Sequence, residues 1–169
     1  MEILFDQEDF LVIDNGTGYI KAGFSGQDLP RIVIPTVVGS FLPPIDPAMV
    51  NTAGVEDEMS RRQWSFGNAA IANKDTHEIV QPINRGVIVD RDNMHQMWQH
   101  IFDELNLDFK SCNVLLTDSP FSTKQSRMET TQFMFETLGV KSLAIMNTAA
   151  LSMYSSGRTS GLVAEVGEG

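Results

Sequence analysis

Two short segments, one near each end of the sequence, carry the residue types best suited to chemistry. Residues 11–18 (LVIDNGTG) and 162–169 (LVAEVGEG) share one pattern: three apolar residues, an acid, any residue, glycine, a polar residue and glycine. Glycine lets backbone N–H groups approach a phosphate, because no Cβ atom stands in the way. One Gly-x-Gly is a weak signal, but the repeat predicts two related half-structures that clamp a polyphosphate from opposite sides.

The side chains around the first turn suit the same ligand. Gly16 and Gly18 offer backbone donors, Thr17 a hydroxyl donor, and Lys21 a positive charge that can reach phosphates. Taken alone, Lys21 is explained as an exposed strand lysine and Asp14 as a turn cap. Together with the repeat, they favour a phosphate site.

The second turn supplies Gly167, Glu168 and Gly169 to the predicted site. Asp14 and Glu165 stand at the ends of the two predicted strands, and a carboxylate repels phosphate. We therefore expect these two acids to hold a hydrated Mg²⁺ ion between themselves and the phosphates. No histidine metal cluster is expected, because the three histidines fall in a predicted loop and on a predicted helix.

The elements that must position the first turn are strands. Two apolar runs on either side of a short glycine turn predict a β-hairpin with arms at 10–14 and 19–24, whereas a Walker-type phosphate loop would join a strand to a helix. A third β-rich run, 32–38, contains Pro35, which predicts an edge strand or a crossing between units.

Residues 36–81 have a different character, with many prolines and little periodicity. We expect a small, loop-rich insertion that forms surface. Its apolar side chains either form a contact surface or pack the insertion itself; these are Phe41, Leu42, Ile45, Met49 and Val50.

After Pro82 strands and helices alternate, which predicts an α/β layer with a partly parallel sheet. Ser122 and Gln125 predict a capping box, and Gly139 a helix end. The expected strands are 87–89, 114–116, 143–146 and 162–166, and the expected helices are 92–105, 122–138 and 147–157. The first helix carries one apolar face typical of core packing, made of Met94, Met97, Trp98, Ile101, Phe102 and Leu105.

Composition limits the classes of partner and the cellular location that we expect. The chain has 169 residues, 42% of them hydrophobic, and a net charge of −10. So acidic a surface repels phosphate backbones, so we expect no direct nucleic-acid binding. The single cysteine, Cys112, excludes an internal disulfide and a cysteine-based zinc cluster. No apolar run is long enough to span a membrane, and we expect a cytoplasmic, cytoskeletal or, alternatively, nuclear protein.

Several segments, in order along the chain, resemble the N-terminal part of actins and actin-related proteins. They include IDNGTGYIKAGFSG, IPTVVG, PINRGVIVD, VLLTDSP and YSSGRTSGLV. The resemblance covers the sequence from Phe10 on, apart from the insertion. Its helical segments and YSSGRT are typical of actins rather than of the sugar kinases and heat-shock chaperones that share the ATPase fold.

This resemblance implies the actin-like, ribonuclease H-like α/β fold, with a mixed sheet, flanking helices and a small inserted subdomain. Residues 1–35 and 82–155 would form an incomplete first subdomain, residues 36–81 the inserted second subdomain, and residues 156–169 the start of a second large domain. Because the resemblance stops inside the second turn, we expect this sequence to belong to a longer chain; the alternative is a short product held by partners.

The resemblance also implies ATP or ADP, with Mg²⁺ or Ca²⁺, between the two turns. Glu165 and Val166 depart from the Asp and Ser-like residues of the family. Thr148 occupies the position of a water-orienting glutamine, and the amide of Asn147 is displaced by one residue, so we expect nucleotide hydrolysis to be slow or absent. Arg85 stands where many actins have histidine.

Three functions remain open. The first is an actin-like nucleotide-binding cytoskeletal protein, and the second is a non-catalytic actin-related scaffold in a ciliary, dynein-associated or chromatin-remodelling assembly. Either would have actin-like subunits or a multiprotein complex as its partners. The third is a sugar-kinase-like enzyme with Asp118 as its base, although a structural turn explains Asp118 better.

Overall fold

The main sheet is built around the N-terminal hairpin. The computed structural model describes residues 10–44 and 58–168. Strands β1 (Phe10–Asn15) and β2 (Tyr19–Phe24) pair antiparallel, as the sequence predicts. Strand β3 (Ile32–Pro35) pairs with β2 at the sheet edge, where a residue without an N–H group is tolerated.

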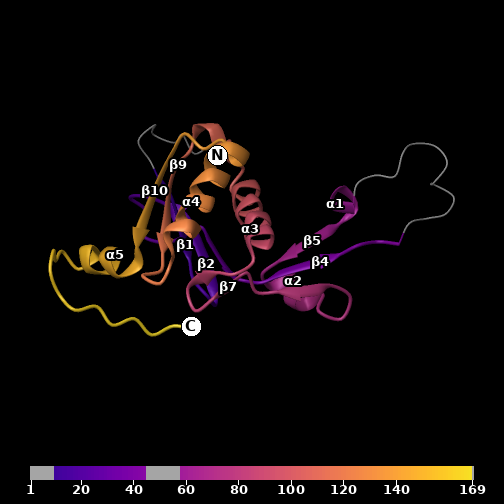
Figure 1. Cartoon of the computed structure of the whole chain (residues 1–169), viewed down its shortest axis with the longest axis horizontal. Helices are drawn as coiled ribbons and strands as arrows, with labels where there is room; N and C mark the ends of the chain where they lie inside the picture. The colour runs from indigo at the N-terminus through magenta and orange to yellow at the C-terminus, as the bar shows by residue number, and fades with distance from the viewer. Residues whose placement is uncertain (1–9, 45–57, 169) are drawn as a thin grey trace.

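Two further strands make the sheet mixed (Figure 1). Strand β9 (Asn113–Asp118) runs parallel to β1, and β10 (Ser142–Asn147) runs parallel to β9. The strand order is therefore β10-β9-β1-β2-β3. This arrangement confirms the predicted α/β layer with a partly parallel sheet.

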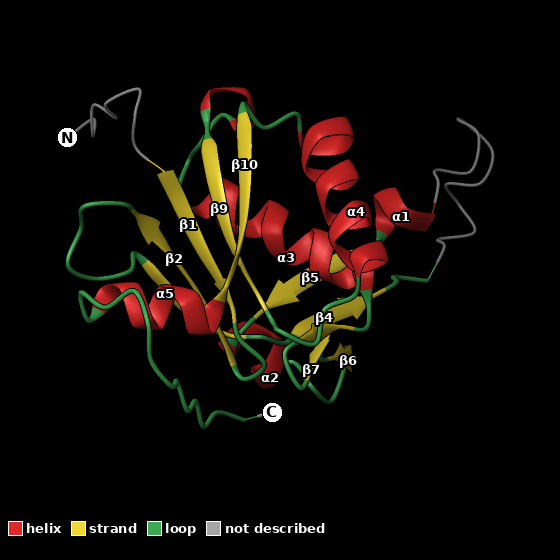
Figure 2. Cartoon of the chain, turned by 60° about the vertical axis from the view of Figure 1, so that its left-hand side comes forward, coloured by secondary structure: helices red, strands yellow, loops and turns green. Residues whose placement is uncertain are grey.

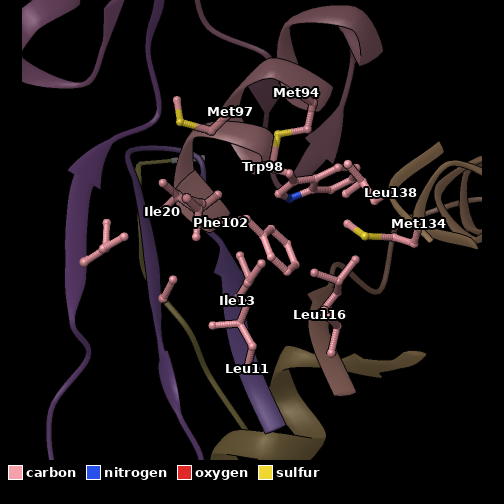
Figure 3. Close-up of a cluster of buried hydrophobic side chains, with 14 of the residues drawn as sticks. Leu11, Ile13, Ile20, Met94, Met97, Trp98, Phe102, Leu116, Met134 and Leu138 are labelled. Atoms are coloured by element: carbon pink, nitrogen blue, oxygen red, sulfur yellow. The ribbon is translucent and has the colours of Figure 1, made fainter. Parts of the chain in front are cut away.

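Helices α3 and α4 cover one face of this sheet (Figure 2). Helix α3 (Arg91–Glu104) begins after Asp90, whose carboxylate accepts the N–H of Asn93 at 3.0 Å. The predicted apolar face is confirmed, and it packs with Ile13 and Leu116 from the sheet (Figure 3). Its fully buried members are Met94, Met97, Trp98, Ile101 and Phe102, while Leu105 is partly buried.

The predicted capping box at Ser122 is wrong by one residue. Helix α4 (Lys124–Gln132) is capped by Thr123, whose hydroxyl oxygen accepts the N–H of Ser126 at 3.1 Å. Ser122 belongs instead to the preceding turn, where its N–H donates to the carbonyl of Ser119. The helix continues as a π-helical turn (Phe133–Leu138) and stops, as predicted, at Gly139, whose φ is 75°.

The described part of the insertion is more regular than predicted. It holds a three-stranded sheet of order β5-β4-β6. The predicted run 32–38 is interrupted at Thr36 and Val37: the residues before them belong to the main sheet, and Val38 begins the inserted sheet. Small buried residues such as Gly39 and Ser65 obscure the alternation that would have revealed these strands. Phe41 and Leu42 are partly buried, and Ile45, Met49 and Val50 lie outside the described residues. The elements are β4 (Val38–Phe41), α1 (Glu58–Arg61), β5 (Gln63–Phe66), α2 (Asn68–Ala72) and β6 (Glu78–Val80).

Strand β8 (Val87–Ile88) pairs only with β7 (Ile83–Asn84) in a separate hairpin within the described chain. A 3-10 turn (Phe109–Ser111) precedes β9, and helix α5 (Thr148–Ser155) follows β10. No helix among the described residues is both long and apolar enough to cross a membrane.

The strand predicted at 162–166 is wrong. Residues 161–168 have no regular secondary structure, and Leu162 is 98% exposed. A strand needs a neighbouring strand for its backbone groups, and none in the described chain pairs with this segment. The segment instead runs from α5 back below the lower edge of the sheet (Figure 1).

Candidate functional site

The first glycine turn connects β1 to β2 and is fixed by the buried residue Thr36. The Thr36 N–H donates to the carbonyl of Gly18 at 2.9 Å, and its hydroxyl donates to the carbonyl of Gly16 at 2.8 Å. A Cβ atom on Gly16 would collide with the carbonyl oxygen of Tyr19. The turn therefore requires glycine at this position.

The carboxylate of Asp14 is held from two sides. One oxygen pairs with the ammonium group of Lys21, opposite it on β2, at 2.8 Å, and the other accepts the hydroxyl of Thr117 at 2.9 Å. The same Thr117 oxygen accepts the N–H of Asn15. Lys21 thus neutralises Asp14 and does not line the cavity beside the turn.

A cavity of about 470 Å³ lies beside the first turn and is also lined by the C-terminal segment. Most of the predicted site residues border it. Its lining residues are Asp14, Asn15, Gly16, Thr17, Arg85, Gly86, Ser119, Pro120, Phe121, Thr148, Ala149, Val163, Glu165, Gly167 and Glu168.

The C-terminal segment comes into contact range of the first turn at Gly18. The carboxylate of Glu168 occupies the space that a Cβ atom on Gly18 would need. Glu165 accepts a hydrogen bond from the hydroxyl of Ser152 on α5 at 2.6 Å. Gly169 lies outside the described residues. The two segments singled out by the repeat therefore meet at one cavity, although the second one forms no hairpin.

The comparison with protein families agrees with this architecture. Residues 5–169 match the family model for actin. The chain belongs to the actin family. Its mixed sheet with flanking helices is accordingly an actin-like fold.

The cavity beside the first turn is rich in carboxylates. Asp14, Glu165 and Glu168 line it together with one described basic residue, Arg85. Such a wall attracts a divalent cation, whose preferred ligands are oxygen atoms. The described residues contain no group of three or more His, Cys, Asp or Glu side chains that could hold a metal ion, so an ion here would need water or phosphate oxygens as further ligands.

Thr148 lines the cavity at the start of α5. Its neighbour Asn147 is the helix cap, and its side-chain oxygen accepts the N–H of Ala149 at 2.9 Å. The Asn147 amide is therefore engaged in the helix terminus. Asp118 is engaged as well, in an ion pair with Arg127, which leaves the sugar-kinase hypothesis without a free base at this position.

Sequence reasoning missed the residues that position the first turn. Thr36, Thr117 and Trp98 all bond to it, yet Thr117 and Trp98 lie 102 and 83 residues from Asn15 in sequence. No local pattern identifies such partners. The sequence marks Arg85 only as a departure from the family, and the glycine after it is the available signal of a tight turn.

A second hollow, of about 620 Å³, lies between the inserted sheet and α3. Trp64, His95 and Phe133 are among its lining residues, and neither glycine turn reaches it. Because its lining includes none of the predicted site residues, it is not the candidate site.

Proposed function

We propose that this actin-family chain binds the phosphates of ATP or ADP, together with Mg²⁺ or Ca²⁺, in the cavity between the two glycine segments. The observation that carries the proposal is that Gly16 and Thr17 line the same cavity as Gly167 and Glu168. Segments from opposite ends of the sequence can thus contact one ligand.

The backbone of the first turn fits a phosphate. Within the described chain, the N–H groups of Thr17 and Gly18 form no hydrogen bond, so they are available to an anion. Because Gly18 has no side chain, the carboxylate of Glu168 fits against it, and a phosphate oxygen of comparable size would take the place of that carboxylate. Gly16, Thr17 and Gly18, with Gly167, Glu168 and Gly169 opposite, are the proposed phosphate-binding residues.

The charged residues have separate proposed roles. Asp14 and Glu165 hold the metal ion through water, because each already has a hydrogen-bond partner that fixes its orientation. Lys21 neutralises Asp14 and so reduces the repulsion between that carboxylate and the phosphates. The bound metal would screen the phosphate charge from the remaining acids.

Hydrolysis is proposed to be weak. Thr148 lines the cavity at the position where the family resemblance places a glutamine. Its side chain is short and has no amide group that could orient an attacking water. Val166 brings no hydroxyl to the second segment. These two positions favour a role in which nucleotide is bound structurally.

The protein is proposed to act as a subunit of a filament or of a larger assembly, in the cytoplasm and cytoskeleton or in the nucleus. Its proposed organisation keeps the subdomains at 1–35 with 82–155, at 36–81, and from 156 on. In actins the region that corresponds to the insertion reaches the neighbouring subunit of the filament. Because the insertion of this chain does not resemble that region, we favour a heterologous multiprotein complex over an ordinary filament. A ciliary, dynein-associated or chromatin-remodelling complex fits this description.

Equilibrium binding of a fluorescent ATP analogue, displaced by unlabelled MgATP, tests the proposal. We expect one saturable site in the parent protein and weaker binding in Gly18→Val, because the new side chain occupies the phosphate space. Gly161→Val, in the exposed segment after α5, is the matched control, because Gly161 has no positive φ, a side chain there would meet open space, and the residue does not line the cavity. The proposal fails if the parent shows no displaceable binding.

A further inference from the structure

The turn between β7 and β8 holds an arginine in an unfavourable backbone conformation. Arg85 has a φ of 49° and Gly86 a φ of 73°. Positive φ at both central residues of a two-residue hairpin is the type I′ pattern, which favours Asn-Gly or Gly-Gly. An L-residue such as arginine is strained there, because its Cβ crowds the carbonyl oxygen. Strain of this kind points to a function that keeps it in place.

The strained turn is fixed against the first glycine turn. The N–H of Gly86 donates to the hydroxyl oxygen of Thr17 at 2.8 Å. On its other side, a Cβ atom on Gly86 would lie only 3.1 Å from the hydroxyl oxygen of Ser119. The turn is thus held between the β1–β2 turn and the loop after β9, and this places Arg85 in the cavity wall.

The charge of Arg85 is available to a ligand. Lys21, the other cation near the first turn, is paired with Asp14 at 2.8 Å. Among the described residues no ion pair is formed by Arg85, and it is the one described basic residue in the lining. An anion entering the cavity otherwise meets the carboxylates of Asp14, Glu165 and Glu168.

We propose that Arg85 binds phosphoryl oxygens of the nucleotide, and that the strained turn is retained because it presents the guanidinium group to them. This inference rests on the function proposed above. A planar guanidinium can bind two phosphate oxygens at once, which an ammonium cannot do in the same geometry. The benefit grows with ligand charge, so Arg85 favours a triphosphate over a diphosphate.

Two substitutions separate binding from backbone effects. Arg85→Gly and Arg85→Asn remove the charge and suit a positive φ, so we expect an unchanged or higher melting temperature. The same variants should bind MgATP about tenfold more weakly, the loss expected for one charge-assisted hydrogen bond, and MgADP should be affected less. Arg85→Lys should keep part of the affinity.

Arg31→Ala is the matched control. Arg31 is exposed, its guanidinium donates to Gln27, and it does not line the cavity. Arg31→Ala removes one positive charge, as the Arg85→Asn substitution does. Because long-range electrostatic interactions are screened by salt, the MgATP affinity of Arg31→Ala should stay within about twofold of the parent's.

Each remaining outcome decides a different point. If the parent binds MgATP and Arg85→Asn binds it equally well, the inference is wrong while the proposed function stands. If affinity falls only where the melting temperature falls too, Arg85 is structural and the inference is again wrong. If the parent binds neither MgATP nor MgADP, the proposed function and the inference fail together.

Discussion

Trp98 of α3 donates its indole N–H to the side-chain oxygen of Asn15 at 3.0 Å. Trp98 is almost fully buried in the core, and Asn15 is the last residue of β1 before the glycine turn. The Asn15 amide also donates to the carbonyl of Thr117 at 3.2 Å. Packing of α3 on the sheet is therefore coupled directly to the orientation of the candidate phosphate turn.

Trp98→Phe tests this coupling. The variant keeps an aromatic ring but removes the donor and part of the core volume, so the free energy of unfolding should fall by about 2–3 kcal/mol. Trp64→Phe, a partly buried tryptophan of β5, should cost less than about 1 kcal/mol. Urea unfolding followed by circular dichroism measures both; equal losses would contradict a special role for the Trp98 bond.

Thr117→Val tests the support of Asp14. The variant removes the donor to the carboxylate and the acceptor for the Asn15 N–H, and a loss of about 1–3 kcal/mol is expected for the unsatisfied groups. Thr131→Val removes a hydroxyl that bonds locally to the Arg127 carbonyl on α4, and it should cost less than about 0.5 kcal/mol. Thermal unfolding of the two variants compares them, and a Thr117 variant as stable as the control would refute this account.

Thr148→Gln tests the proposed loss of hydrolysis. An amide at this position can orient a water, and correct positioning is worth up to about 10²-fold in rate. Phosphate release from ATP should therefore increase in the variant and remain at the parent level in Thr159→Gln, a substitution in the exposed segment after α5. Parent turnover equal to that of Thr148→Gln would show that Thr148 does not limit the rate.

The two histidines of α3 predict a pH dependence of stability. His95 stacks on Phe133 with ring centroids 3.5 Å apart, and His100 stacks on Phe66 at 4.3 Å. Burial lowers the pKa of both imidazoles below the ordinary 6.5, partly offset by Asp92 for His95 and by Glu104 and Asp103 for His100; Arg91 lowers the pKa of His95 further.

The sign follows from proton binding. Below pH 6.5 the unfolded chain binds protons at these histidines before the folded chain does, so stability falls as the pH drops from about 6.5. Each histidine contributes less than about 1.4 kcal/mol per pH unit. Urea unfolding between pH 5 and 7.5 measures this slope, and His95→Phe combined with His100→Phe should flatten it. An unchanged slope in the double variant would rule out these two groups as its source.

Local patterns predicted the elements whose residues alternate or recur clearly. The face of α3 through Met94, Trp98 and Phe102 follows helical spacing, and the first hairpin combines two apolar runs with a glycine turn. The segment 162–166 has a similar apolar run but no pairing strand in the described chain. Sequence pattern reports which residues suit a strand and not whether a neighbour is present.

The candidate site was predictable only where a sequence pattern marks its residues. Gly16 and Gly167 were found from a repeat within the sequence, whereas the bonds of Thr117 and Gly86 to the first turn depend on tertiary contacts. The strain at Arg85 also depends on a two-residue turn that the Arg-Gly pair does not favour.

Hydrogen–deuterium exchange with and without MgATP tests the central claim most directly, because it reports on both glycine segments in one measurement. We predict slower amide exchange at residues 14–21 and at residues 163–168 in the presence of MgATP than in its absence. Protection of one segment alone, or of neither at saturating MgATP, would contradict a shared phosphate site.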